Sequence, residues 1–218
     1  MTPKNKKKFV EIFNVSRETI KKFDYYCQLV SQANLKVNLI SNKSINEIWL
    51  RHFADSVKIF FIMKENLMHE EINSAKVCDI GSGAGFPGAV VQIMLEQWKL
   101  ETKIDLIESV KKKCIFLEYL KSKLNANFSV INERCENIDG SYDIIMCRAV
   151  APLKKLIPML SKISHPKTVF FLSKGKKWDK ELNEIKNNWK FNLDIVKNNK
   201  ILDNTGGVTL IVKNLGKK

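Results

Sequence analysis

Hydrophobic and polar positions change their spacing near residue 76 of the chain. Before that point, apolar residues recur every three or four positions in two stripes, which predicts two amphipathic helices. The stripes are Ile20, Phe23, Cys27 and Val30, then Ile45, Trp49, Phe53, Val57 and Phe60. Ser16 is a suitable N-cap for a first helix that ends near Ala33. Residues 44–47 read Ser-Ile-Asn-Glu, which matches a capping box and predicts a second helix ending near Ile62.

After residue 76, short runs with β-strand composition alternate with helical segments. The predicted strands are 76–80, 103–108, 128–132, 142–147, 168–173, 193–196 and 208–212, and the predicted helices are about 87–97, 110–124, 152–163 and 177–189. Such alternation favours a parallel sheet with helices on both faces. The last two predicted strands are separated by about 11 residues, including Asn204-Thr-Gly-Gly207, which is too short for a helical crossover. We therefore expect a hairpin and an antiparallel last strand.

These elements predict a Rossmann-like α/β fold with a seven-stranded sheet. Residues 1–75 would form an N-terminal helical extension, and residues 76–218 one compact domain.

A glycine-rich loop follows the first predicted strand, with the sequence Val77-Cys-Asp-Ile-Gly-Ser-Gly-Ala-Gly-Phe-Pro-Gly88. Glycines there allow close approach to a ligand at the carboxyl ends of the strands. A dinucleotide fold favours Gly-x-Gly-x-x-Gly, but Phe86 takes the third position of that pattern counted from Gly81. The glycines at 81, 83 and 85, with Asp79 two residues before them, instead favour S-adenosylmethionine, whose ammonium Asp79 would contact directly or through water.

Two further strand ends carry candidate site residues. Glu108 ends the second strand and is placed to accept hydrogen bonds from ribose hydroxyls, although a surface carboxylate is the alternative. After the fourth strand, Arg148 is a candidate for the cofactor carboxylate or the substrate, or for a structural ion pair. Cys147 is either a buried apolar residue or a thiolate nucleophile, with a pKa that Arg148 would lower. A nucleophile that needs no deprotonation, such as guanine N7, fits the absence of an evident general base.

The formal charge of +14 is concentrated near the C-terminus, where residues 150–218 carry +10 of it. A localised basic surface favours nucleic-acid binding, whereas 33 lysines against 4 arginines also fit the coding bias of an AT-rich genome. Apolar runs are too short for a membrane span, and the N-terminus does not resemble a signal peptide. The five cysteines form no Cys-x-x-Cys pair. We therefore expect a cytoplasmic protein without a metal site.

The chain resembles the bacterial 16S ribosomal RNA guanine-N7 methyltransferase G family, also called glucose-inhibited division protein B. The matching segments lie between about residues 25 and 180. They are Asn38-Leu-Ile, Arg51-His-Phe-Ala-Asp-Ser56, Asp79 to Gly88, Glu108-Ser-Val-Lys-Lys-Lys113, Arg134-Cys-Glu-Asn-Ile138, Cys147-Arg-Ala149 and Lys174-Gly175.

The resemblance implies a class I methyltransferase fold, S-adenosylmethionine as methyl donor and a guanine of the decoding region of 16S ribosomal RNA as acceptor. It implies cofactor contacts at Gly81, Phe86, Cys135, Glu136 and Arg148, although Cys135 departs from the small or aliphatic residue expected there. The acceptor would lie in the small ribosomal subunit or a precursor, and we expect the enzyme to be a monomer.

Two groups outside the loop are candidates for the substrate side. His52, Asp55 and Ser56 would lie on one side of the second helix, where they would shape the acceptor pocket or fix the helix to the domain. Arg148, His52 and Asp55 are the candidates for positioning roles, and we assign no catalytic base. Lys174 is a candidate phosphate contact or a solvated lysine, and Lys176 and Lys177 extend the candidate RNA-binding group.

Overall fold

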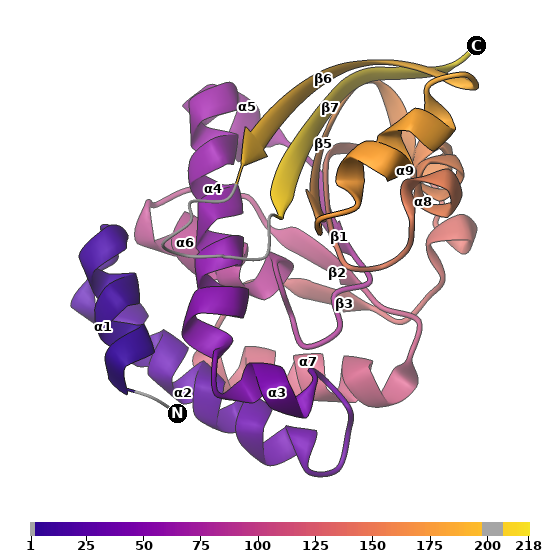
Figure 1. The fold of residues 1–218 in the computed structure, drawn as a ribbon. Helices are drawn as coiled ribbons and strands as arrows, with labels where there is room; N and C mark the ends of the chain where they lie inside the picture. Colours follow the sequence, from indigo (N-terminus) through magenta and orange to yellow (C-terminus); the bar gives the residue numbers. More distant parts are fainter. Residues whose placement is uncertain (1–2, 198–206) are drawn as a thin grey trace.

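Seven strands form one mixed sheet in the computed structural model, which describes residues 3–197 and 207–218 (Figure 1). The strand order is β3-β2-β1-β4-β5-β7-β6. The strands are β1 (Val77–Ile80), β2 (Ile104–Ile107), β3 (Ser129–Ile131), β4 (Tyr142–Arg148), β5 (Ser164–Lys174), β6 (Trp189–Lys197) and β7 (Val208–Lys217). Strands β1 to β5 pair in parallel, and β7 runs antiparallel to both β5 and β6. The predicted antiparallel last strand is confirmed; most of the predicted turn at 204–207 lies outside the described residues.

Two layers of helices cover the sheet. The helices are α1 (Pro3–Ile12), α2 (Arg17–Asn34), α3 (Asn42–Ile45), α4 (Ala54–Asn66), α5 (His69–Ser74), α6 (Gly88–Gln97), α7 (Lys111–Leu124), α8 (Leu153–Leu160) and α9 (Trp178–Ile185). Short turns of other helix types are η1 (Trp49–Phe53), η2 (Cys135–Asn137) and η3 (Ser161–Ile163). Because neighbouring strand residues point to opposite faces, Val77 joins a core with α6, α7 and the N-terminal helices, whereas Cys78 joins a core with α8 and α9.

The strand β6 begins four residues before the predicted start and takes Trp189 from the predicted helix 177–189. Trp189, Phe191 and Leu193 alternate with more exposed residues, and all three pack against the core on the α8 and α9 face. This period-two pattern fits an edge strand with one covered face. Because β6 already begins at Trp189, helix α9 ends earlier than predicted, at Ile185.

Of the two helices predicted before residue 76, the first is present as α2, and the second does not form as predicted. Ser16 accepts a hydrogen bond from the Thr19 N–H and caps α2. The Ser44 hydroxyl, however, donates to the Ser41 carbonyl inside the short helix α3, and Glu47 pairs with Arg51. The predicted capping box is therefore wrong. A π-helical turn, η1, leads into α4 instead, although Trp49, Phe53, Val57 and Phe60 are buried as expected.

The N-terminal helices share their core with the first face of the sheet. Phe23, Phe53 and Phe60 belong to the same cluster as Val90 of α6 and Leu117 of α7. The division at residue 75 stays a prediction, and these contacts bring the extension directly against the helices that flank the glycine loop (Figure 1).

Candidate functional site

The candidate site lies where the strand order changes direction, between β1 and β4. The loop after β1 and the segment after β4 both leave the sheet at its carboxyl edge, which is where open α/β sheets bind ligands. Gly81, Gly83 and Gly85 have φ values of +70°, +57° and +92°, a region that favours glycine. The N–H groups of Gly81 and Ser82 donate to the Ile107 carbonyl, which joins the loop to the end of β2.

Asp79, in β1, forms a hydrogen bond to the end of the glycine loop. Its side chain is fully buried, and Oδ2 accepts a hydrogen bond of 2.9 Å from the Gly88 N–H at the start of α6. Its other oxygen, Oδ1, is buried without a hydrogen-bond partner among the described residues. Burial raises the pKa of Asp79 to about 7, above its ordinary value of 3.8. The loop therefore depends on a carboxylate that has one unsatisfied oxygen.

Glu108 joins the loop to the segment after β2. Its two carboxylate oxygens accept hydrogen bonds from the Gly83 N–H at 3.0 Å and the Val110 N–H at 2.8 Å, and the residue is buried. The surface-carboxylate alternative for Glu108 is therefore wrong. Since a carboxylate has about four acceptor positions, Glu108 retains capacity for a ligand at this edge.

Tyr26 of α2 supports the same loop from the opposite side. Its hydroxyl donates a 2.6 Å hydrogen bond to the Ala84 carbonyl, and its ring stacks on Phe86 at 5.3 Å between centroids. A Cβ at Gly85 would lie 2.3 Å from the Tyr26 hydroxyl. Tyr26 was not among the residues predicted from the sequence. Its only signal there was its position beside Cys27 of the apolar stripe.

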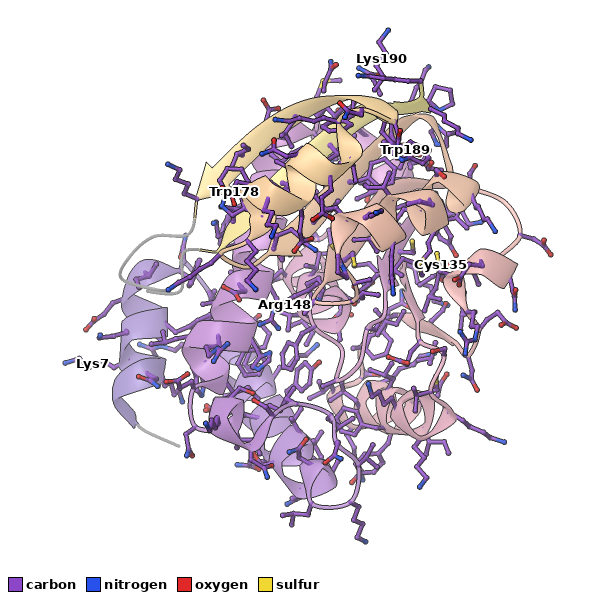
Figure 2. All side chains as sticks on the ribbon, turned by 45° about the vertical axis from the view of Figure 1, so that its right-hand side comes forward. Lys7, Cys135, Arg148, Trp178, Trp189 and Lys190 are labelled. Carbon is purple, nitrogen blue, oxygen red and sulfur yellow. The ribbon has the colours of Figure 1, made fainter. Side chains whose placement is uncertain are left out.

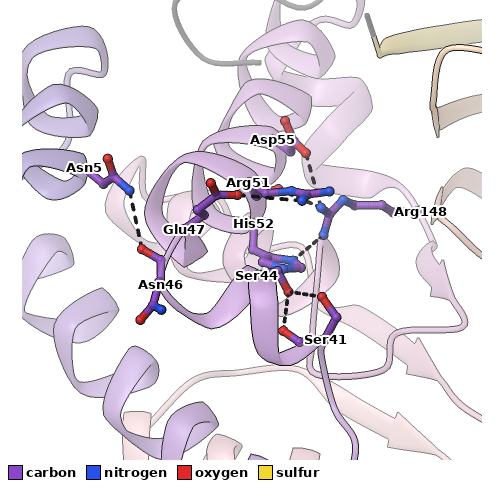
Figure 3. A network of polar contacts seen from close by, with 9 residues as sticks. All are labelled: Asn5, Ser41, Ser44, Asn46, Glu47, Arg51, His52, Asp55 and Arg148. Atoms are coloured by element: carbon purple, nitrogen blue, oxygen red, sulfur yellow. Dashed lines mark hydrogen bonds and ion pairs between the residues drawn. The ribbon is translucent and has the colours of Figure 1, made fainter. Parts of the chain in front are cut away.

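Arg148, at the end of β4, is bound by the N-terminal helices (Figure 3). Its Nη2 donates to the Arg51 carbonyl at 2.6 Å and lies 3.3 Å from the Asp55 carboxylate. Its Nη1 lies 2.6 Å from His52 Nδ1. The ion-pair interpretation of Arg148 is thus confirmed, and His52 and Asp55 do reach the sheet together. Ser56 instead donates to the His52 carbonyl within its own helix.

His52 is neutral in this network. Burial, followed by the charges of Arg148 and Arg51, lowers the pKa of His52 to about 2. Because Nδ1 accepts from the guanidinium, the ring proton resides on Nε2, which is buried without a partner among the described residues. The ring also lies 4.8 Å from the Phe86 ring. His52 therefore contacts both Arg148, at the end of β4, and Phe86 of the glycine loop.

Two cavities open at this edge of the sheet, and Val150 lines both. The larger, of about 470 Å³, is bordered by Arg51, Asp55 and Arg148 on one side and by Lys174 and Glu181 on the other. The smaller, of about 120 Å³, is bordered by Gly81, Ile107, Ser109, Cys135 and Glu136. Val150 Cγ2 would lie 2.4 Å from a Cβ at Gly81. Val150 was not predicted either, because the apolar segment after β4 carries no pattern of its own.

Cys135 and Glu136 of η2 border the smaller cavity, on the far side of the sheet end from the N-terminal helices. Figure 2 shows Cys135 well apart from Arg148, which lies near the centre of the molecule. Cys135 is buried, and Glu136 is exposed. The structure therefore brings Gly81, Cys135 and Glu136 together around one cavity and assigns Arg148 to the other.

Two predictions for single residues need correction. Burial, followed by the charge of Asp79, raises the pKa of the Cys147 thiol, so the thiolate interpretation is wrong. Lys174 is mostly buried and donates to Glu181 at 2.6 Å and to the Ala151 carbonyl at 2.8 Å. It is thus neither solvated nor available to a phosphate, whereas Lys176 and Lys177 are exposed.

The part of the chain that the structure describes contains no cluster of three or more His, Cys, Asp or Glu residues that could hold a metal ion. In the same residues, no helix is long and apolar enough to cross a membrane.

The raised pKa of Asp79 predicts a pH-dependent stability. Between about pH 4 and 7 the folded chain keeps a proton on Asp79 that the unfolded chain releases, so the free energy of unfolding falls as pH rises through this range. Each unit of pKa difference corresponds to about 1.4 kcal/mol. Asp79→Asn keeps an acceptor for the Gly88 N–H and removes the titration. Denaturant unfolding at a series of pH values should give a smaller decline in stability for the variant, and parallel profiles for the two proteins would contradict the assignment.

Comparisons with known proteins agree with this architecture. The family model of rRNA small subunit methyltransferase G matches residues 19–206. A Ribosomal RNA small subunit methyltransferase G from Bartonella tribocorum is 36% identical over 183 residues, covering 83% of this chain and 82% of the relative. Its namesake from Aquifex aeolicus is 37% identical over 171 residues, covering 78% of this chain and 83% of the relative.

Among solved structures, magnesium protoporphyrin IX methyltransferase from Synechocystis, with bound S-adenosylmethionine, matches with a TM-score of 0.59 at 12% identity. The match covers 92% of this chain and 99% of that one. At this identity the likeness supports the class I methyltransferase fold alone. The family match and the relatives together identify the chain, which belongs to the rRNA small subunit methyltransferase G family.

Proposed function

We propose that this protein transfers a methyl group from S-adenosylmethionine to N7 of a guanine in the decoding region of 16S ribosomal RNA. The observation that carries the proposal is the pair of cavities that meet at Val150, within a chain of this family. One cavity borders the glycine loop, and the other borders the residues after β4 and β5. Donor and acceptor would occupy one each, which brings their reacting atoms together at the end of β4.

The residues at the glycine loop fit the methyl donor. Asp79 has a buried, unpartnered oxygen that a cationic group would satisfy, and Glu108 has acceptor capacity for hydroxyl groups. Gly81, Cys135 and Glu136 line the smaller cavity and would line the donor site, whereas Gly85 and Phe86, also predicted there, are buried against Tyr26 and Gly83 borders neither cavity. When bound, S-adenosylmethionine supplies an electrophilic methyl carbon on a sulfonium, whose carbon–sulfur bond breaks as the acceptor lone pair forms the new bond.

The larger cavity fits an acceptor that loses no proton. Its two carboxylates belong to ion pairs, Asp55 with Arg148 and Glu181 with Lys174. An exocyclic amine would need a base for its proton, whereas guanine N7 has a free lone pair at neutral pH. Arg148, held by His52 and Asp55, would position the substrate or the methionine end of the donor, which is one of the roles that the sequence predicted for Arg148.

The geometry of the α6 N-terminus disfavours a dinucleotide oxidoreductase. In dinucleotide folds the pyrophosphate binds the first N–H groups of this helix. Here Asp79 already accepts the hydrogen bond of the Gly88 N–H, so this donor is not available to a pyrophosphate. A methyl donor with an ammonium instead needs a hydrogen-bond acceptor, which the unpartnered Asp79 Oδ1 would provide. We further expect the acceptor in the small subunit or its precursor, and the protein as a monomer.

Methyl transfer tests the reaction directly. Labelled S-adenosylmethionine, incubated with this protein and with 16S RNA or 30S particles from cells lacking the enzyme, should yield label in 7-methylguanosine by mass spectrometry of the nucleosides. Label in another nucleoside would retain the methyltransferase and reject N7. Bound donor without any label would reject this RNA as the acceptor.

Replacement of Gly83 tests the donor site. Space around Gly83 is open, but its φ of +57° disfavours a β-branched residue, so Gly83→Val should disturb the loop and the Glu108 contact without overpacking. We expect at least a tenfold loss of S-adenosylmethionine affinity in calorimetry. Gly140→Val is a matched control, because Gly140 also has a positive φ and open surroundings but lies outside the glycine loop. Equal affinities in the two variants would remove the loop from the site.

Tyr26→Phe tests whether the N-terminal extension shapes the donor site. The change keeps the ring on Phe86 and removes the hydrogen bond to Ala84, a net loss of about 1 kcal/mol. We expect donor affinity to fall about fivefold. Tyr142→Phe removes a comparable hydrogen bond, from a mostly buried tyrosine to Asp105, away from the loop, and should leave donor affinity unchanged. The same affinity for both variants would limit Tyr26 to a structural role.

A further inference from the structure

Six exposed lysines lie at the carboxyl edge of the sheet. They are Lys111, Lys112, Lys154, Lys155, Lys176 and Lys177, here called the lysine rim. Helices that follow parallel strands begin at the edge where those strands end. Lys111 and Lys112 therefore open α7 after β2, Lys154 and Lys155 lie in the first turn of α8 after β4, and Lys176 and Lys177 precede α9 after β5.

The rim lies on both sides of the two cavities. Helix α7 packs on one face of the sheet, whereas α8 and α9 pack on the other (Figure 1). Ser109, two residues before the first rim lysine, borders the smaller cavity. Pro152 and Gly175, each within two residues of a rim lysine, border the larger one. The charges thus flank the opening through which a substrate base would enter.

The rim lysines have no anionic partner within the described chain. None of the six forms an ion pair there, whereas Lys6, Lys22 and Lys174 each pair with a carboxylate. Residues 109–113, 149–155 and 175–178 contain no Asp or Glu. The segment after β3 differs, since Glu133 and Glu136 accompany Arg134 beside the smaller cavity. At the opposite edge, lysines alternate with acids such as Glu101 and Asp143.

The positions of Lys111, Lys112, Lys154 and Lys155, in the first turns of α7 and α8, are unfavourable for folding stability. The first turn of a helix is the positive end of its dipole, where lysine is unfavourable and Asp or Glu is favourable. The first turns of α7 and α8 contain lysines and no acidic residue. Coding bias toward lysine accounts for the number of lysines but not for the lack of acids in the first turns of α7 and α8, whereas the first turn of α9 contains Asp179 and Glu181. Glu108 and Glu181 accept hydrogen bonds from the N–H groups of Val110 and Leu153 at the starts of α7 and α8, so an external anion would compensate the lysine charges rather than the helix ends.

We propose that the lysine rim binds the backbone phosphates of the RNA strand on both sides of the acceptor nucleotide. The inference rests on the proposed function for the identity of the strand. A base that enters the larger cavity remains covalently joined to its neighbours, so their phosphates must lie at the edge of that cavity. A nucleic acid strand supplies such regularly spaced anions, and Lys174, bound to Glu181, takes no part.

Four substitutions test the rim without touching either cavity. The variant Lys111→Gln, Lys112→Gln, Lys154→Gln and Lys155→Gln should bind a 16S RNA transcript roughly 10- to 100-fold more weakly at 0.1 M salt. The slope of log affinity against log salt should flatten by about 0.7 for each phosphate that the variant no longer neutralises. The melting temperature should not fall, because the charges that are removed oppose the helix dipoles.

The matched control changes the same number of exposed lysines at the opposite edge: Lys99→Gln, Lys103→Gln, Lys123→Gln and Lys167→Gln. The control should bind RNA nearly as the unchanged protein does, and both variants should retain S-adenosylmethionine affinity. Equally weakened binding in the two variants would show that net charge alone acts, and unweakened binding in the rim variant would overturn the proposal. RNA binding that needs the rim, without methyl transfer by the unchanged protein, would keep this surface and reject the proposed reaction.

Discussion

The burial of the Arg148 guanidinium links the two parts of the chain. A guanidinium removed from water needs acceptors for its N–H groups, and β4 provides none at that position. The N-terminal helices supply them through the Arg51 carbonyl, the Asp55 carboxylate and His52 Nδ1. A neutral His52 is required, since a protonated ring could not accept. The extension is therefore part of the wall of the site.

The glycine loop is stabilised in a comparable way, by groups from elements on both sides. Asp79 binds it from the sheet, Glu108 from the end of β2, and Tyr26 from the extension. The aromatic contacts among Tyr26, Phe53 and Phe86 continue this support into the core of the N-terminal helices. The three polar groups thus act on different residues of the loop and fix it at three points.

Much of the fold could be predicted from sequence, because strand burial and the glycine loop are local signals. The start of β1 differs from the prediction by one residue, and the antiparallel β7 followed from a connection too short for a crossover. The second N-terminal helix was mispredicted, because other local contacts compete with the capping box: Ser44 bonds back to Ser41, and Glu47 pairs with Arg51 one turn later. The site residues at the ends of the strands, such as Asp79, Glu108 and Arg148, were predicted from the sequence. Tyr26 and Val150 depend on contacts between distant segments, and the Lys174–Glu181 pair depends on the turn between β5 and α9; periodicity encodes neither.

The distribution of charge at the site separates chemistry from recognition. Each of the three cations that line the larger cavity has an anionic partner, Arg148 with Asp55, Lys174 with Glu181 and Arg51 with Glu47, so the cavity carries little net charge toward a neutral base. Outside, the rim lysines form no ion pair among the described residues, and the four of them in α7 and α8 are opposed by the helix dipoles. A neutral cavity within a basic rim suits an acceptor whose reacting atom is uncharged and whose backbone is anionic. This division also explains why total charge was a poor guide to individual lysines: Lys174 and Lys176 are two residues apart, and of these two only Lys176 is free of the internal ion pairs.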